Sequence, residues 1–517
     1  MTPLLRVLPV LAALLLAAVL GAATPVLEGR MLLLLAALAP LPLIFWDYRV
    51  GVLLLTLVLP VSAMLPPIRG LNVLNFLTLA TLASFTLRAA FSQGAGGLRG
   101  QQGLQGQTPG VTWLPSRLVW GFWLPVTLGL LIAWPHISEG ARNYPRLENA
   151  RLIYEPMNYA IDRYVKPLLY YFGFAFLLAN AVRHSRRPEG FIAALAVSAL
   201  LPAFAVLATV AVYPGSFAQL TQDREFMAPR GMHANEFGQL LAIASAPLLF
   251  VAGGGRHGSG SRALRLLTGA SFCIVTLAML LTFSRGGLLV WLIGVAAFLV
   301  HHRRVKTMLL GALAVAVFLL AAPAALQERF GAGLRKGAIS DTSNVAKDEL
   351  TAGRVYGWTL LAPEVLESPW VGRGLGSTQW SQAVAMGRYK ADHPHNIYLE
   401  VLMDLGLFGF VALTWVVVGH LRRYRTLAAD PALSPEMRSF FLGSRFALWG
   451  ALAMAATTAY YMPNPAQAYL WFCLGLAFAD WRPRGAAKPA AVPAAAAAAV
   501  PATTLRNARR ARHADRP

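Results

Sequence analysis

The most regular feature of the sequence is a succession of apolar runs, each bounded by charged residues or by Pro and Gly. A hydrocarbon core of about 30 Å needs roughly 20 apolar residues per helical crossing. Applied loosely, because several runs are short, this criterion predicts about fourteen membrane-spanning helices, or about twelve if the weakest runs are left out. The predicted spans are residues 4–20, 31–45, 50–65, 73–91, 118–134, 167–183, 190–212, 235–252, 264–282, 286–301, 306–322, 396–419, 441–460 and 466–481.

The composition agrees with this pattern. The chain of 517 residues is 56% hydrophobic and only 13% charged, which is too little charge to cover the surface of a soluble domain. We therefore predict an all-α polytopic membrane protein of about 12–14 transmembrane helices, with a long periplasmic loop and a GT-C-like architecture. The first apolar run is expected to be an uncleaved helix, because further hydrophobic segments follow it at once.

The net charge of +22 is spread over inter-helix joints and the C-terminal tail. Nucleic-acid binding is disfavoured, because its usual footprint is a basic patch on one face. The basic residues fall in alternate joints, as the positive-inside rule demands, and this predicts that both termini are cytoplasmic. Cys273 and Cys473 lie in apolar runs and are expected to be small packing residues, with no disulfide or metal cluster.

Three of the predicted non-cytoplasmic joints are long, and the longest exceeds ordinary connection lengths. Its tryptophans and mixed charges predict short amphipathic helices that lie against the bundle. The long joints are residues 135–166, 213–234 and 323–395. The predicted organisation is a transmembrane bundle over 1–322, a large periplasmic loop over 323–395, C-terminal transmembrane helices over 396–484, and a disordered basic cytoplasmic tail over 485–517.

Single arginines recur in the predicted non-cytoplasmic joints, both long and short, beside small or helix-starting residues. They are Arg230 in PRGMHANEFG, Arg285 in the tight turn FSRGG, and Arg354 in TAGRVYGW. Arginine recognises phosphate oxygens bidentately, and the glycines after Arg285 let a backbone or ligand approach closely. Several arginines on one side without matching acids predict an anionic ligand. The alternative for each is a side chain that anchors a helix end at the interface.

Two histidines, His393 and His395, stand where the span at 396 begins, in the segment HPHN. Asn396 is a good helix N-cap. The positive end of a helix dipole disfavours imidazolium, so a histidine held neutral there can take a proton from a hydroxyl near neutral pH. The alternative is that His395 is only a polar residue at a capped helix start.

The stretch HNIYLEVLMDLGLFG (395–409) combines His-Asn with two glycines in GxxG spacing. Upstream, TAGRVYGWTLLAPEVLESPWVGRGLGSTQW (351–380) contains an Arg, a Trp four residues later, a Pro and a Gly-x-Gly-x-Gly. Together these motifs resemble the signature of the bacterial O-antigen ligase and O-antigen polymerase superfamily, and the FSRGG and ANEFG segments resemble further family features. The resemblance covers roughly residues 225–415.

Enzymes of that superfamily take a glycan from a polyprenyl (undecaprenyl) pyrophosphate carrier on the outer face of the inner membrane and pass it to an acceptor hydroxyl. The resemblance implies that His395 is the general base and that Arg285 and Arg230 bind the pyrophosphate. The sequence has no P-loop or Rossmann fingerprint, and nothing distinguishes the neighbouring acids Asp341, Asp348 and Glu349 from a solvated loop. We therefore predict a metal-independent transferase without a cofactor. The implied substrate-binding residues are Arg354, His393, Asn396 and Trp358, with His393 also a candidate for shaping the loop.

The acceptor and the subtype stay open. Lipid A–core, as in lipopolysaccharide biosynthesis, another carrier-linked glycan, as in O-antigen or exopolysaccharide polymerisation, and a protein are all acceptors within the superfamily. A flippase is an expected functional partner, alongside membrane lipid. A non-catalytic transporter of lipid-linked sugars is the competing class, and it would need paired charges and broken helices near the bilayer midplane.

Overall fold

The computed structural model describes residues 39–65, 73–94, 111–143, 156–185, 187–223, 225–254, 261–303, 354–458 and 460–481. Contacts divide the chain into residues 1–479 and 480–517, and the contacts given below lie in the first unit. Several predictions fall outside the described residues: the spans 4–20 and 306–322, the tail 485–517, and both termini.

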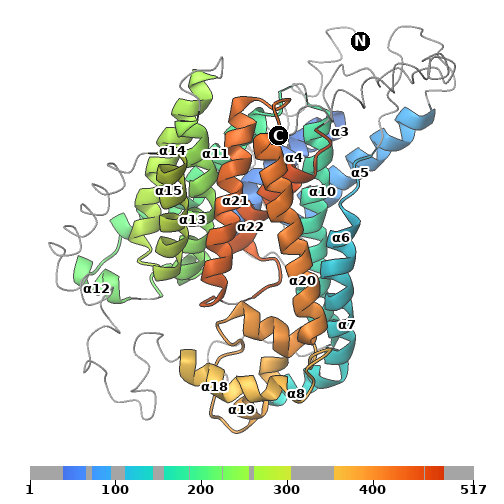
Figure 1. The fold of residues 1–517 in the computed structure, drawn as a ribbon, viewed down its shortest axis with the longest axis vertical. Coiled ribbons are helices and arrows are strands. Elements are labelled where there is room, and N and C mark those ends of the chain that lie inside the picture. The colour runs from blue at the N-terminus through green and yellow to red at the C-terminus, as the bar shows by residue number, and fades with distance from the viewer. Residues whose placement is uncertain are drawn as a thin grey trace, which may run out of the picture. The chain divides into compact units, whose positions relative to one another are not determined.

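Helices make up the described secondary structure (Figure 1). The α-helices of five or more residues are α3 (Leu41–Trp46), α4 (Tyr48–Val58), α5 (Val73–Gly94), α7 (Leu124–Ala133), α8 (Ile137–Asn143), α9 (Pro156–Ala160), α10 (Gly173–Arg183), α11 (Gly190–Ala211), α12 (Phe217–Gln222), α13 (Ala234–Gly253), α14 (Arg262–Leu281), α15 (Arg285–His301), α18 (Arg354–Val365), α20 (Ile397–Ala429), α21 (Pro435–Ala455) and α22 (Ala468–Phe478). The short helices and turns are η1 (Leu59–Met64), α6 (Ser116–Leu118), η3 (Val119–Trp123), η4 (Trp134–His136), η6 (Ile161–Val165), η7 (Leu168–Phe172), η8 (Ala228–Arg230), η9 (Ser377–Trp380), α19 (Gln382–Ala385) and η10 (Pro465–Gln467).

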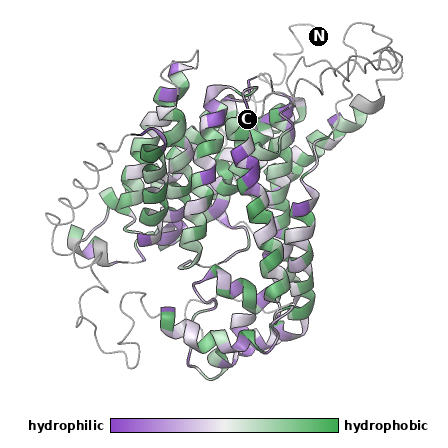
Figure 2. Ribbon diagram, in the orientation of Figure 1, coloured by the Kyte–Doolittle hydropathy of each residue, from purple (hydrophilic) through white to green (hydrophobic). Residues whose placement is uncertain are grey.

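Within the described residues, seven helices are long and apolar enough to cross a membrane, and this confirms the predicted all-α polytopic membrane fold. Figure 2 shows that apolar residues predominate along their lengths. The seven are Val73–Phe91, Ser116–Gly140, Pro156–Arg183, Gly190–Ala211, Ala234–Gly253, Arg262–Leu281 and Ile397–Ala429, and the shorter apolar helices are Tyr48–Met64, Arg285–His301 and Pro465–Phe478.

The predicted joint 135–166 is shorter than expected. The helix after Ser116 continues to Asn143, and the next helical run begins at Pro156 instead of residue 167. The prediction ended the helices at their polar residues, but Asp162 and Lys166 form an i,i+4 ion pair on the helix, which lets charged residues continue it.

Helix α21 overlaps the predicted span 441–460 but is not among the seven apolar helices, because it carries polar and charged residues. It packs against α13, α15 and α20. Helix α13 is the most enclosed of the seven, with 78% of its apolar window buried against 33% for α14. Small residues allow these close crossings: a Cβ on Gly443 would lie 2.7 Å from the Ala246 carbonyl oxygen. Cys473 is buried as expected, whereas Cys273 is exposed on α14 and does not serve packing.

Helix α20 is broken near its start, at Gly406, where φ is 63° and ψ is −166°. The break exposes backbone groups that the long loop satisfies. Arg373 N–H donates to the Met403 carbonyl (2.7 Å), and Leu407 N–H donates to the Pro369 carbonyl (2.8 Å). Broken helices are tolerated inside a membrane protein only where the protein itself satisfies the backbone in this way. The loop segment around 369–374 therefore lies alongside the apolar helix.

The Gly-x-Gly-x-Gly of the loop explains how it is held. Gly372, Gly374 and Gly376 all have positive φ. A Cβ on Gly374 would lie 2.4 Å from the Ala133 nitrogen at the end of α7, and one on Gly372 would lie 2.4 Å from the Asp404 carbonyl carbon in α20. The glycine motif thus fastens the loop to two helices that are far apart in the sequence.

Candidate active site at the start of helix α20

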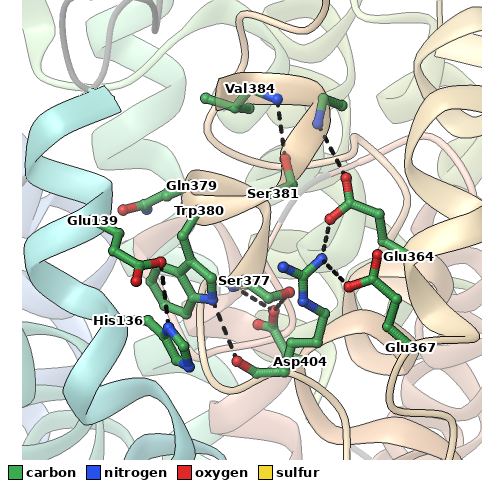
Figure 3. A network of polar contacts seen from close by, with 12 residues as sticks. His136, Glu139, Glu364, Glu367, Ser377, Gln379, Trp380, Ser381, Val384 and Asp404 are labelled. Atoms are coloured by element: carbon green, nitrogen blue, oxygen red, sulfur yellow. Dashed lines mark hydrogen bonds and ion pairs between the residues drawn. The ribbon is translucent and has the colours of Figure 1, made fainter. Parts of the chain in front are cut away.

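A buried polar frame orders the loop that leads to α20 (Figure 3). Arg373 forms ion pairs with Glu364 on α18 and with Glu367 (3.2 Å to the latter). Glu364 also accepts a hydrogen bond from Ala383 N–H at 3.1 Å, which joins α18 to α19. Trp380 Nε1–H donates to the Arg373 carbonyl at 3.3 Å. This frame joins α18, the segment around Arg373 and the start of α19 ahead of the histidines.

The His-Asn motif forms a tight turn into α20. Asn396 Oδ1 accepts hydrogen bonds from the backbone of Tyr398 (3.0 Å) and Leu399 (3.2 Å), which confirms the predicted N-cap. His395 has φ of 51°, a left-handed conformation that costs free energy unless its surroundings impose it. Trp358 contributes to this constraint, because its Nε1–H donates to the Pro394 carbonyl at 2.9 Å.

The two histidines contact each other and extend into a chain of polar groups. His393 Nε2 lies 3.1 Å from His395 Nδ1, and His393 Nδ1 lies 2.5 Å from Asp392 Oδ1. Tyr460 Oη–H donates to Asp392 Oδ2 at 3.0 Å. Tyr460 also has positive φ, at 65°, and its backbone N–H donates to Glu400 Oε2 at 2.8 Å. The turn between α21 and α22 is thereby joined to the start of α20.

Burial and neighbouring charges determine the protonation states of His395 and Asp392. Burial lowers the pKa of His395 to about 3, with further lowering from the charges of His393 and Arg354 and a partial offset from Asp392. Burial raises the pKa of Asp392, but the hydrogen bond and charge of His393, the charge of Arg163 and the hydrogen bond from Tyr460 outweigh it and lower the pKa to about 2. At neutral pH, His395 is therefore neutral and Asp392 is a carboxylate.

A small cavity opens beside this series of polar groups, and it is lined by charged groups from η6, from α20 and from the loop before α20. The Arg163 guanidinium lies 5.1 Å from the centre of the Tyr460 ring. Asp404 accepts hydrogen bonds from Ser377 Oγ–H (2.7 Å) and from Tyr461 Oη–H (3.2 Å). The lining residues are Tyr159, Arg163, Leu375, Gly376, Gln379, Asp392, Glu400, Asp404, Tyr460, Tyr461 and Met462.

Sequence reasoning marked Tyr159 and the arginines of the 135–166 joint as possible glycan contacts and Gly376 as part of the glycine motif, but it did not select the acidic residues of this cavity or Tyr460. Glu400 and Asp404 stand four residues apart within an apolar run, and ionisable residues there are a signal for an internal polar site. Arg163 was placed in that joint, and Tyr460 at the end of a span. Across the described residues, no three His, Cys, Asp or Glu side chains gather in a way that could hold a metal ion. The acidic residues Asp341, Asp348 and Glu349 lie outside the described residues.

The structure brings some of the predicted site residues together. Trp358 contacts the histidine turn directly, and the charge of Arg354 reaches both His395 and Tyr389. Tyr389 Oη–H in turn donates to the His393 carbonyl at 2.8 Å. Arg354, Trp358, His393 and Asn396 therefore surround His395.

Arg230 and Arg285 lie in two motifs that approach each other outside the histidine turn. Both are exposed, and Arg230 Nε–H donates to Thr209 Oγ1 at 3.1 Å. The motifs that carry them touch, because a Cβ on Gly238 would lie 2.4 Å from the Ser284 Cβ. The last turn of α21 links these motifs to the histidine turn. A Cβ on Gly286 would lie 2.9 Å from Met454 Sδ, and Tyr398 Oη–H donates to the Leu452 carbonyl at 2.6 Å.

Backbone strain marks the same region. Among the described residues, four that are not glycine have positive φ. Three of them belong to the segments just described: Phe283 precedes the Arg285 turn, and His395 and Tyr460 belong to the polar chain. Strained residues of this kind concentrate at functional sites.

Replacing Trp358 by Phe is expected to cost about 1 kcal/mol of stability and a few-fold of activity, because it removes one hydrogen bond to the histidine turn and keeps the ring. Thermal unfolding in detergent and the activity of the purified protein measure the two effects. Trp370→Phe is the matched control, since that side chain is 69% exposed. Equal effects of the two substitutions would contradict a role for the Trp358 hydrogen bond.

The fold and the site define a polytopic helical membrane protein with an internally hydrogen-bonded polar site at one end of its bundle. Residues 270–414 match the O-antigen ligase family, which confirms the resemblance to the O-antigen ligase and polymerase superfamily. The matched segment includes Arg285, Arg354 and both histidines, whereas Arg230 lies before it. No curated protein matches the chain. The family match supports a membrane glycosyltransferase of the O-antigen ligase or polymerase type.

Proposed function

We propose that the protein transfers a glycan from a polyprenyl-pyrophosphate carrier to an acceptor hydroxyl at the periplasmic face of the bacterial inner membrane, as in O-antigen ligation to lipid A–core. The observation that carries the proposal is the neutral His395, held in a strained turn at the start of α20 within the segment that matches the family. A neutral imidazole with a free nitrogen is suited to take a proton from a hydroxyl.

In the proposed reaction, His395 acts on the acceptor hydroxyl and the arginines act on the leaving pyrophosphate. A nitrogen of His395 takes the proton of the acceptor hydroxyl while the hydroxyl oxygen forms a bond to the anomeric carbon of the glycan. The bond from that carbon to the pyrophosphate oxygen breaks, and the carrier leaves as polyprenyl pyrophosphate. Arg285, Arg230 and Arg354 offset the negative charge that grows on the leaving group, which is an electrostatic contribution of the kind that often dominates catalysis.

A transporter of lipid-linked sugars is the second candidate, because α20 is broken and charged residues lie within apolar helices. The contacts of these groups argue against it. The Glu400 and Asp404 carboxylates accept hydrogen bonds from the backbone N–H groups of Tyr460 and Ser377, respectively, which favours a structural support for an interfacial site.

Substitution of Arg285 tests whether the protein binds a pyrophosphate-linked donor. Arg285→Ala is expected to lower kcat/KM for a polyprenyl-pyrophosphate-linked glycan by about 10–100-fold, because hydrogen bonds to charged groups contribute about 1.5–3 kcal/mol. Inorganic pyrophosphate should inhibit the wild type and inhibit Arg285→Ala more weakly. Arg425→Ala is the matched control, since Arg425 is an exposed arginine towards the far end of α20.

An unchanged kcat/KM for Arg285→Ala, or equal effects at Arg285 and Arg425, would reduce Arg285 to an interfacial anchor. The subtype is decided in the native host with an inactive variant. Long carrier-linked chains that accumulate outside indicate a blocked ligase, and single repeat units indicate a blocked polymerase. A wild-type protein that moves intact carrier-linked glycan across a vesicle membrane without transferring it would instead establish the transporter.

A further inference from the structure

The contact between His393 and His395 determines which ring nitrogen of His395 can act as a base. A general base needs one ring nitrogen that is not already used as an acceptor. His395 Nδ1 lies 3.1 Å from His393 Nε2, so this nitrogen takes part in a hydrogen bond within the protein. Only Nε2 of His395 then remains for the acceptor hydroxyl, and it is a free base only if Nδ1 carries the ring proton.

We propose that Asp392 and His393 form a positioning relay that sets the tautomer of His395. In this relay His393 Nδ1–H donates to Asp392, and His393 Nε2 accepts the Nδ1–H of His395. The lone pair of His395 Nε2 is thereby directed at the acceptor. His393 is then a positioning residue that acts through His395 and does not itself bind the glycan. The inference rests on the proposed function only in taking His395 as the general base.

The surroundings of Asp392 support the first link. Its two oxygens are used separately, Oδ1 by His393 at 2.5 Å and Oδ2 by Tyr460 Oη–H at 3.0 Å. Tyr460 is itself fixed, because its carbonyl accepts from Gln467 Nε2–H at 3.0 Å. A carboxylate held on both sides keeps a proton on His393 Nδ1, as the second partner of a catalytic histidine does in other relays.

The relay also explains how the positive charge that forms on His395 during the reaction is stabilised. The neutral form of His395 is favoured by burial and by the charge of Arg354 on α18. When His395 Nε2 takes a proton, the imidazolium donates through Nδ1–H to a neutral His393, and Asp392 lies behind it. A protonated His393 has no lone pair to accept with, and its charge opposes the new one. The other groups around the chain are Arg163 on η6, Tyr389 in the loop, Glu400 on α20 and Tyr460.

The test separates an acceptor at the His393 position from a mere space-filling ring. His393→Gln places a neutral carboxamide oxygen where Nε2 was, whereas His393→Phe keeps a ring without an acceptor. We expect His393→Phe to lower kcat by about 10²-fold with little change in the KM for donor, and His393→Gln to restore most of it.

Asp392→Asn is expected to lower kcat and leave KM unchanged, as for the loss of the anion that holds a catalytic tautomer. Trp358→Phe is the control for a loosened turn, since it removes a hydrogen bond to the same turn and leaves the relay intact. The relay is overturned if His393→Phe and His393→Gln have equal kcat. It is equally overturned if the variants change only the melting temperature. An inactive wild-type protein would instead refute the proposed function, and a transferring wild type with an inert His393→Phe would refute the relay alone.

Discussion

Replacing His395 by Ala is expected to lower glycan transfer by about 10²–10⁴-fold, the usual contribution of a positioned general base. The protein should still fold, because the helix cap belongs to Asn396 and the turn is held by Trp358. In the native host, surface glycan should disappear while carrier-linked glycan accumulates outside the inner membrane. A gel of surface glycans and carrier-linked intermediates, at matched membrane levels of the two proteins, measures the effect.

Asn396→Ala is the matched variant for the competing role of this turn. Loss of the cap should cost about 1 kcal/mol of stability, whereas His395→Ala should cost activity. A His395→Ala protein that transfers glycan at the wild-type rate would show that His395 only shapes a helix start, and the general-base mechanism would be wrong.

The lowered pKa of His395 also has a consequence for stability. Below pH 6.5 the unfolded chain protonates this histidine and the folded protein does not until about pH 3, so the contribution of His395 to the free energy of unfolding falls as the pH drops through this window. The melting temperature of the wild type should therefore fall more between pH 7 and 5 than that of His395→Ala. Equal slopes would contradict a neutral, buried imidazole.

Replacing Gly406 by Ala is expected to disrupt the assembly of the site. Its φ of 63° with ψ of −166° is a backbone conformation found essentially only for glycine, which costs an alanine about 1–3 kcal/mol. In addition, the new Cβ would lie 2.4 Å from the Trp370 carbonyl carbon, and this overlap is with backbone that cannot rotate away. The loop should therefore separate from α20, with loss of transfer and a large fall in melting temperature.

Gly387→Ala separates these two costs. Gly387 has a similar φ of 69°, but no atom lies within 4 Å of a Cβ placed there. It should show only the conformational cost, a few degrees in melting temperature. Limited proteolysis adds a direct view, because trypsin should cleave after Arg373 in Gly406→Ala once its ion pairs with Glu364 and Glu367 are lost. Equal behaviour of the two variants would mean that the close contact with Trp370 is not needed.

The apolar runs of the sequence determined the class of fold, because a bilayer requires each crossing to be a long apolar helix. The expected spans at 73–91, 190–212, 235–252 and 264–282 agree with described helices to within a few residues. Local chemistry was readable as well. Asn396 caps α20 as an Asn before an apolar run should, and the glycine motifs stand where the backbone has positive φ or approaches another segment closely.

Only the tertiary structure decided which groups line the cavity beside the two histidines. Arg163, Asp392, Glu400 and Tyr460 come from different segments, and neither spacing nor periodicity relates them. The same holds for the break at Gly406, whose freed backbone groups are satisfied by a loop more than thirty residues upstream, as in Leu407 N–H to the Pro369 carbonyl. Hydropathy reports the preference of a segment for lipid or water. Contacts between distant segments depend on the packing of the whole bundle, which no local pattern encodes.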